Sequence, residues 1–101
     1  MKYLVTGLPG TTPIPPEQAA DLFQAAAEWG EAALADGRVD CLYNFADGGG
    51  IGIGNADSHE AVFGMLMSYP MYPFFEWEVR PLCDWGQTFK IILEGMLRGG
   101  G

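Results

Sequence analysis

The sequence has little of what several classes of protein require. Two of its 101 residues are cysteine and one is histidine, which is too few for a disulfide framework or a zinc site. Five lysines and arginines stand against thirteen acids, and the formal net charge of −8 disfavours nucleic acid and anionic membranes as partners. No apolar run is long enough for secretion or for spanning a bilayer. We therefore expect a reduced, cytoplasmic protein without a metal or an organic cofactor, binding neither nucleic acid nor membrane.

Apolar and aromatic residues are abundant. They make up 49% and 13% of the chain, which indicates a packed globule rather than disorder. A chain of this length can bury one hydrophobic core and is too short for two.

Hydrophobic periodicity and turn residues divide the chain into a regular series of elements. Two helices are expected, one from near Pro15 to Asp36 and one that starts at a cap on Asp57 or Ser58 and ends before Pro70. Strands are expected at 2–8, 39–46, 51–55 and 75–79. Strand, helix, strand, strand, helix, strand is the ferredoxin-like α+β order, with a four-stranded antiparallel sheet and both helices on one face. We predict this domain over residues 1–86, followed over 87–101 by a short amphipathic helix and a glycine tail.

The segment from Asp57 to Leu82 is the most distinctive part of the chain. Asp57 or Ser58 can cap a helix, and Pro70 and Pro73 prevent that helix from continuing. The Tyr-Pro-Met-Tyr-Pro-Phe connection leads into a strand that closes with Val-Arg-Pro-Leu. In this order the chain resembles the muconolactone delta-isomerase family. The resemblance implies paired sheets in a homo-oligomer, either a dimer or a larger ring of subunits.

The same resemblance implies a cofactor-independent isomerase or lyase-like proton transfer on a small apolar, cyclic or aromatic-derived molecule. In that family, charged groups point into a pocket between the first helix and the sheet. The matching stretch here contains Ala25, Ala26 and Ala27, which can neither move a proton nor stabilise an oxyanion. We therefore expect a substrate other than muconolactone. Two alternatives stay open, a small-molecule binding protein without catalysis and an oligomeric assembly unit.

Three residues are candidates for proton transfer, and two of them also have a purely structural interpretation. Glu28 is the acid nearest the alanine stretch, but it shares a helix side with other acids and can be a solvated charge. His59 near a helix N-terminus is biased toward the neutral, basic form, although side chains in a first turn usually face water. Tyr43, on the second strand, is the third candidate.

A roomy apolar space is predicted beside the third strand, where Gly52 and Gly54 alternate with isoleucines. Glycine in a strand often marks the close approach of another group, here an aromatic side chain, a ligand or a second backbone. Aromatic residues around this space complete the predicted ligand-binding set, which is Tyr3, Trp29, Gly52, Gly54, Phe63 and Trp77.

Overall fold

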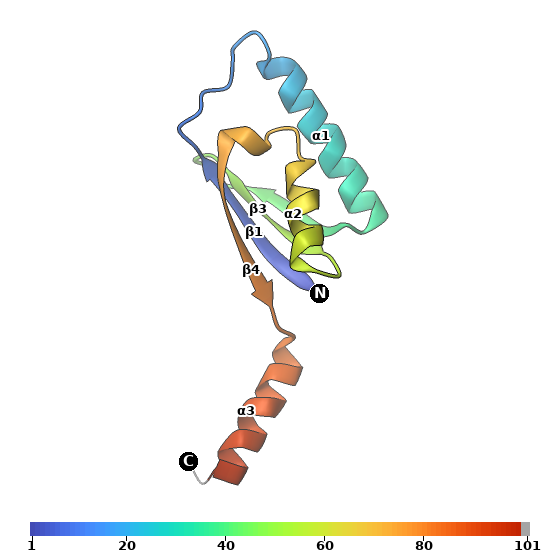
Figure 1. Ribbon diagram of the computed structural model, residues 1–101, viewed down its shortest axis with the longest axis vertical. Helices are drawn as coiled ribbons and strands as arrows, with labels where there is room; N and C mark the ends of the chain where they lie inside the picture. The colour runs from blue at the N-terminus through green and yellow to red at the C-terminus, as the bar shows by residue number, and fades with distance from the viewer. Residues whose placement is uncertain (100–101) are drawn as a thin grey trace.

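A computed structural model describes residues 1–99 and has the predicted ferredoxin-like α+β fold (Figure 1). The sheet is antiparallel with strand order β2-β3-β1-β4, and α1 and α2 cover one of its faces. The part of the predicted glycine tail at 100–101 lies outside the described residues. The elements are β1 (Lys2–Pro9), α1 (Ala19–Asp36), β2 (Val39–Asn44), β3 (Gly50–Asn55), α2 (His59–Met67), the short 3₁₀ helix η1 (Tyr72–Phe74), β4 (Phe75–Leu82) and α3 (Trp85–Gly99).

Helix boundaries follow local signals. Ser58 rather than Asp57 caps α2, because its Oγ accepts a hydrogen bond from the amide of Ala61 at 3.1 Å. Gly37, at φ 82°, ends α1 in the left-handed conformation. The predicted start of α1 near Pro15 is too early, since residues 16–18 form a turn and the helix begins at Ala19.

A β-bulge in β2 changes which side chains face the helices. Strict alternation along the sequence would place Val39, Cys41 and Tyr43 on one face of that strand. The register shifts between Val39 and Cys41, so that one extra residue enters the strand. Beyond the bulge, Leu42 and Asn44 instead share the helix-facing side with Val39, because they pair with Gly52 and Gly50.

The hydrophobic core is small and lies between the helices and the sheet. Among the described residues, the buried apolar side chains are Tyr3, Ala33, Val39, Val62 and Met71. A hydrogen bond of 3.0 Å from Trp29 Nε1 to Ser68 Oγ joins α1 to the C-terminal end of α2. This contact helps to hold the two helices side by side over the sheet.

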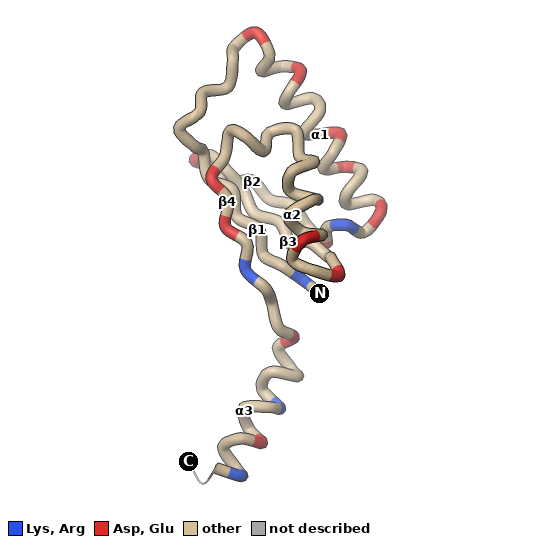
Figure 2. The backbone as a smooth tube through the Cα atoms, viewed as in Figure 1, with Lys and Arg blue, Asp and Glu red and all other residues tan. Residues whose placement is uncertain are grey.

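Helix α3 extends beyond the sheet rather than packing on it (Figure 1). It starts two residues before the predicted Gln87, and Asp84 caps it by accepting a hydrogen bond from the Gln87 amide at 3.0 Å. Acidic residues are spread over α1 and β4, whereas α3 carries both signs of charge (Figure 2). Within residues 1–99, no helix has the combined length and apolar content needed to cross a membrane.

Candidate functional site

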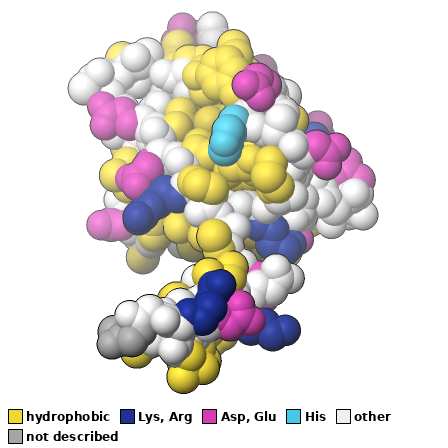
Figure 3. Space-filling view, turned by 60° about the horizontal axis from the view of Figure 1, so that its bottom comes forward, with side chains coloured by type: hydrophobic (Ala, Val, Ile, Leu, Met, Phe, Trp, Pro, Cys, Tyr) yellow, Lys and Arg dark blue, Asp and Glu magenta, His cyan; other side chains and the backbone are white. Residues whose placement is uncertain are grey.

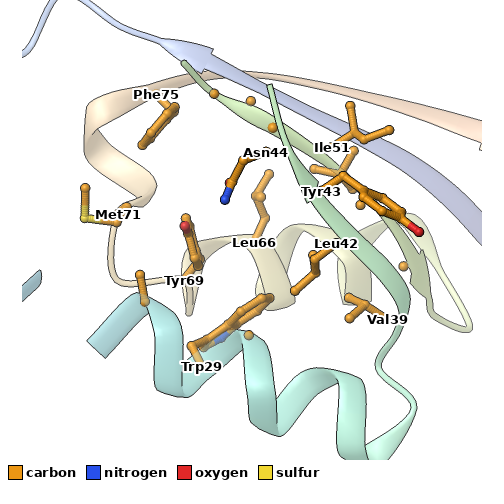
Figure 4. A pocket seen from close by; sticks show the side chains of 18 of the residues that line it. Trp29, Val39, Leu42, Tyr43, Asn44, Ile51, Leu66, Tyr69, Met71 and Phe75 are labelled. Carbon is orange, nitrogen blue, oxygen red and sulfur yellow. The ribbon is translucent and has the colours of Figure 1, made fainter. Parts of the chain in front are cut away.

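A cavity of about 600 Å³ lies between the two helices and the sheet (Figure 4). Small residues create it, because Ala26 and Ala27 on α1 face Gly52 and Gly54 on β3 across the space. The remaining lining is mostly aliphatic and aromatic, including Leu66 on α2. A volume of this size within an apolar wall suits a small organic ligand.

The strand glycines have different neighbours. A Cβ atom on Gly52 would lie 2.7 Å from Leu42 Cδ2, whereas one on Gly54 would lie 3.7 Å from Met65 Cε. Of the three possible neighbours considered for these glycines, the aromatic side chain is therefore wrong. It occurs at Gly7 instead, where a Cβ atom would lie 2.6 Å from Trp77 Cζ3.

An aromatic cluster forms one wall of the cavity. The ring of Tyr69 meets Trp29 edge to face at 5.1 Å and Trp77 at 5.8 Å between centroids. Both indole N–H groups are already used, by Ser68 Oγ and by the backbone carbonyl of Tyr72, each at 3.0 Å. The two tryptophans therefore offer a ligand their apolar rings rather than a hydrogen bond.

Two polar side chains point toward each other across this apolar space, Tyr69 from the segment after α2 and Asn44 from β2 (Figure 4). Burial raises the pKa of the Tyr69 hydroxyl above its usual value of 10.0, so the hydroxyl stays protonated and can donate a hydrogen bond. Asn44 adds a carboxamide that can donate and accept. Glu31 on α1 is the one carboxylate among the described residues that line the cavity, and it is exposed.

From the sequence, Asn44 is one of several polar residues expected near the apolar space, whereas Tyr69 and Glu31 are not predicted as site residues. Asn44 faces the cavity only because of the bulge in β2, which alternation along the strand does not predict. Tyr69 lies between α2 and η1, where no periodicity assigns a direction. The Tyr69-Pro70 pair directly after the helix could have marked Tyr69 as a residue outside the helix, because proline disfavours helical backbone at the preceding residue.

Four of the six predicted ligand-binding residues line the cavity, namely Trp29, Gly52, Gly54 and Trp77. Tyr3 is 1% exposed and is not among the lining residues. Phe63 is 56% exposed and lies outside the lining.

The three predicted catalytic residues are not brought together. Tyr43 contributes to the lining, but its ring points to the side of the sheet opposite the helices (Figure 4). His59 is exposed at the start of α2 and meets the ring of Tyr3 edge to face at 5.5 Å. Glu28 is exposed and accepts a hydrogen bond from Gln24 Nε2 at 3.1 Å.

The fold and the cavity define a ferredoxin-like α+β domain with room for a small molecule between its helices and its sheet. The family model of muconolactone delta-isomerase matches residues 1–88. The chain belongs to this family, as the segment from Asp57 to Leu82 indicated.

Two solved structures share the fold. A crystal structure of muconolactone isomerase has a TM-score of 0.73 and 23% identity, over 83% of this chain and 90% of that one. The 5-chloro-2-hydroxyhydroquinone dehydrochlorinase of Burkholderia phenoliruptrix AC1100, in complex with 2,5-dihydroxybenzoquinone, has a TM-score of 0.64 and 16% identity, over 86% and 98%. No curated protein matches the chain.

Proposed function

We propose that the chain binds a small cyclic, aromatic-derived molecule in this cavity and catalyses an isomerase- or lyase-like proton transfer on it. The main support is the apolar cavity of about 600 Å³ into which the Tyr69 hydroxyl and the Asn44 carboxamide point. The aromatic wall would hold the ring of the ligand, and the two polar groups would orient its oxygen atoms.

In the proposed reaction, Glu31 takes a proton from a carbon next to a carbonyl group and returns it at another carbon. The electrons of the broken C–H bond move onto the carbonyl oxygen as the enolate forms. The protonated Tyr69 hydroxyl donates a hydrogen bond to that oxygen, and Asn44 supports it. Every step uses groups that line the cavity, so the reaction needs no organic cofactor.

The comparisons support this class of molecule. One protein of the same fold is named for a substituted hydroquinone and was solved with a benzoquinone, and the other is named for a lactone. Alanines at 25–27, where the family resemblance implies charged groups, favour a substrate other than muconolactone.

Deuterium exchange tests the proposed proton transfer without knowledge of the final product. Muconolactone, 2-cyclohexenone and hydroxyhydroquinone would each be incubated with the protein in D₂O, and loss of carbon-bound hydrogen followed by NMR. Exchange should fall about 10²- to 10⁴-fold in Glu31→Gln and about 10²- to 10³-fold in Tyr69→Phe. Glu28→Gln is the matched control, because Glu28 lies outside the lining.

Two results would contradict the assignment. Full activity of Glu31→Gln would show that Glu31 is not the general base. Loss of activity in Glu28→Gln or His59→Gln would show that the residue changed in that variant takes part in the proton transfer instead. The second candidate function, binding without catalysis, is favoured by the exposure of Glu31, which leaves that carboxylate hydrated. Ligand binding without exchange in any of the mixtures would support it.

We also propose that the chain works as a homo-oligomer. Five apolar side chains are buried among the described residues, whereas eighteen large ones are exposed. Association of identical subunits would remove much of this surface from water. The cytoplasmic location expected from the sequence remains a prediction, for which isolating the native protein from cell fractions is the test.

A further inference from the structure

The lining of the cavity contains a single charged side chain. Among the described residues that form the wall, Glu31 alone is charged at neutral pH, and its charge is negative. The two polar side chains that point into the space, Tyr69 and Asn44, are both neutral. A bound molecule therefore meets hydrogen-bond donors and acceptors, but no side chain that could pair with a negative charge on it.

The basic residues of the sheet domain lie outside this lining. Residues 1–84 contain three of them, and each forms an ion pair at the surface. The pairs are Lys2 with Asp40, Arg38 with Asp36, and Arg80 with Glu78. Figure 3 shows basic side chains at the surface of the molecule, several of them beside acidic ones. In the part of the chain that the structure describes, each cation of this domain is therefore already offset by a neighbouring acid.

Arg38 comes into contact with a residue of the wall without facing the ligand space. Its guanidinium lies 5.4 Å from the centroid of the Trp29 ring, and Arg38 itself does not line the cavity. Arg38 Nε donates to both carboxylate oxygens of Asp36, at 3.0 and 2.8 Å. The backbone amide and the guanidinium of Arg38 hold the pKa of Asp36 below its usual value, so that Asp36 stays ionised. The charge of Arg38 is thus offset where it stands.

The mouth of the cavity has the same character as its interior. Phe23, Ala27, Glu31 and Leu34 follow one another at intervals of three or four residues along α1, and all four are exposed and line the cavity. They form one edge of the opening, because they contact both the solvent and the ligand space. A ligand that enters past this edge meets apolar side chains and one negative charge.

The proposed reaction keeps one negative charge in the cavity from beginning to end. Before the proton moves, the charge is on Glu31; afterwards Glu31 is protonated and the charge is on the enolate oxygen. A ligand that carries a carboxylate would bring a second negative charge. Burying a charge in apolar surroundings is costly unless an opposite charge or several hydrogen bonds compensate it.

We propose that the cavity selects uncharged cyclic molecules and discriminates against those that carry a carboxylate. This inference rests on the proposed function and narrows its substrate class to neutral ring compounds with carbonyl or hydroxyl oxygens, such as cyclic ketones and quinols. Tyr69 and Asn44 supply hydrogen bonds that suit such oxygens. The net charge of −8 acts in the same direction, because it lowers the local concentration of anions.

Pairs of ligands that share a shape and differ in charge test the proposal. One pair is 2,5-dihydroxybenzamide and 2,5-dihydroxybenzoate, and the other is 3-oxocyclohex-1-ene-1-carboxamide and its carboxylate. Isothermal titration calorimetry at neutral pH would give the ratio of the two dissociation constants, carboxylate over carboxamide. High salt would screen the net charge of the protein and leave the effect of the cavity. We expect a ratio of at least about 10 for each pair that binds.

A cation added to the lining should remove this discrimination. Ala27→Arg places a guanidinium at the cavity, whereas Ala32→Arg adds the same charge to α1 outside the lining. The ratio should fall at least about tenfold in Ala27→Arg and stay unchanged in Ala32→Arg. The volume of the new side chain largely cancels, because both ligands are measured on the same variant.

Removal of the negative charge gives a second readout with little change in volume. Glu31→Gln should lower the ratio about threefold or more, whereas Glu28→Gln, outside the lining, should leave it unchanged. Circular dichroism would verify the fold of each variant. If Ala27→Arg does not fold, the comparison of Glu31→Gln with Glu28→Gln decides.

The outcomes separate the inference from the function on which it rests. Equal affinities within a pair, or tighter binding of the carboxylate, would overturn the selection by charge and leave the proposed function standing. The same ratio in Ala27→Arg and Ala32→Arg would also overturn it, because the discrimination would then not arise in the cavity. Binding of neither member of either pair would contradict the proposed function, and the inference would fail with it.

Discussion

Alanine at Gly52 and at Gly54 should change stability in opposite directions, although the two glycines are neighbours on one face of β3. Replacing glycine by alanine at a compatible position stabilises a protein by about 0.4–1 kcal/mol, because the unfolded chain loses conformational freedom. At Gly54 the new Cβ would lie 3.7 Å from Met65 Cε and 3.9 Å from the Arg38 carbonyl oxygen, which are ordinary contacts. Gly54→Ala should therefore raise the melting temperature by about 2–8 °C.

At Gly52 the same Cβ would lie 2.7 Å from Leu42 Cδ2 and 3.2 Å from the Cys41 carbonyl oxygen. The side chain of Leu42 must move, and overpacking of this kind typically costs about 1–3 kcal/mol. Alanine restricts the unfolded chain equally in both variants. The difference between their free energies of unfolding should therefore equal the overpacking cost, about 1–3 kcal/mol. Thermal and urea unfolding followed by circular dichroism would measure it. Equal stabilities would show that contacts at the two glycines do not govern the packing of β3.

Three further predictions concern the cavity and its supports. Muconolactone should isomerise weakly or not at all in a direct turnover assay, because α1 presents alanines at 25–27; turnover like that of an authentic isomerase would contradict this. Burial raises the pKa of Tyr69, so Tyr69→Phe should remove tyrosinate absorbance that develops above pH 10. Because the folded-state pKa is higher than the unfolded-state pKa, the stability linked to Tyr69 is present below pH 10 and is lost as the pH rises through the folded-state pKa. Ser68→Ala should lower the free energy of unfolding by about 0.5–1 kcal/mol in urea titrations, because Trp29 Nε1 loses its acceptor, whereas no change would show that water replaces it.

The order of the elements could be predicted because each boundary has a local cause. Ser58 caps α2 through its own side chain, and Gly37 ends α1 in a conformation that glycine adopts readily. Gly48 and Gly49, at φ 111° and 85°, form the predicted turn between β2 and β3. These signals lie within a few residues of the structure that they determine.

The site depends on contacts between distant segments, so the sequence predicted its apolar wall better than its polar groups. The structure places Trp29 and Trp77 in the cavity wall, where Trp29 packs against Tyr69 and Trp77 against Gly7, and their role in ligand binding stays a prediction. Asn44 and Tyr69 point into the same cavity only because of the bulge in β2 and the turn after α2. Neither feature has a periodic pattern that fixes the direction of a side chain.

Ligand titration of two matched variants tests the central claim, that this cavity binds a small cyclic molecule. Ala27 lines the cavity, whereas Ala32 lies on the same helix outside the lining, and both are exposed. Isothermal titration calorimetry with 2,5-dihydroxybenzoquinone, hydroxyhydroquinone and muconolactone would compare Ala27→Phe and Ala32→Phe with the unchanged protein. We expect at least one of these compounds to bind the unchanged protein and Ala32→Phe equally, and Ala27→Phe at least tenfold more weakly. Equal affinity of all three proteins, or binding of none of the compounds, would contradict the claim.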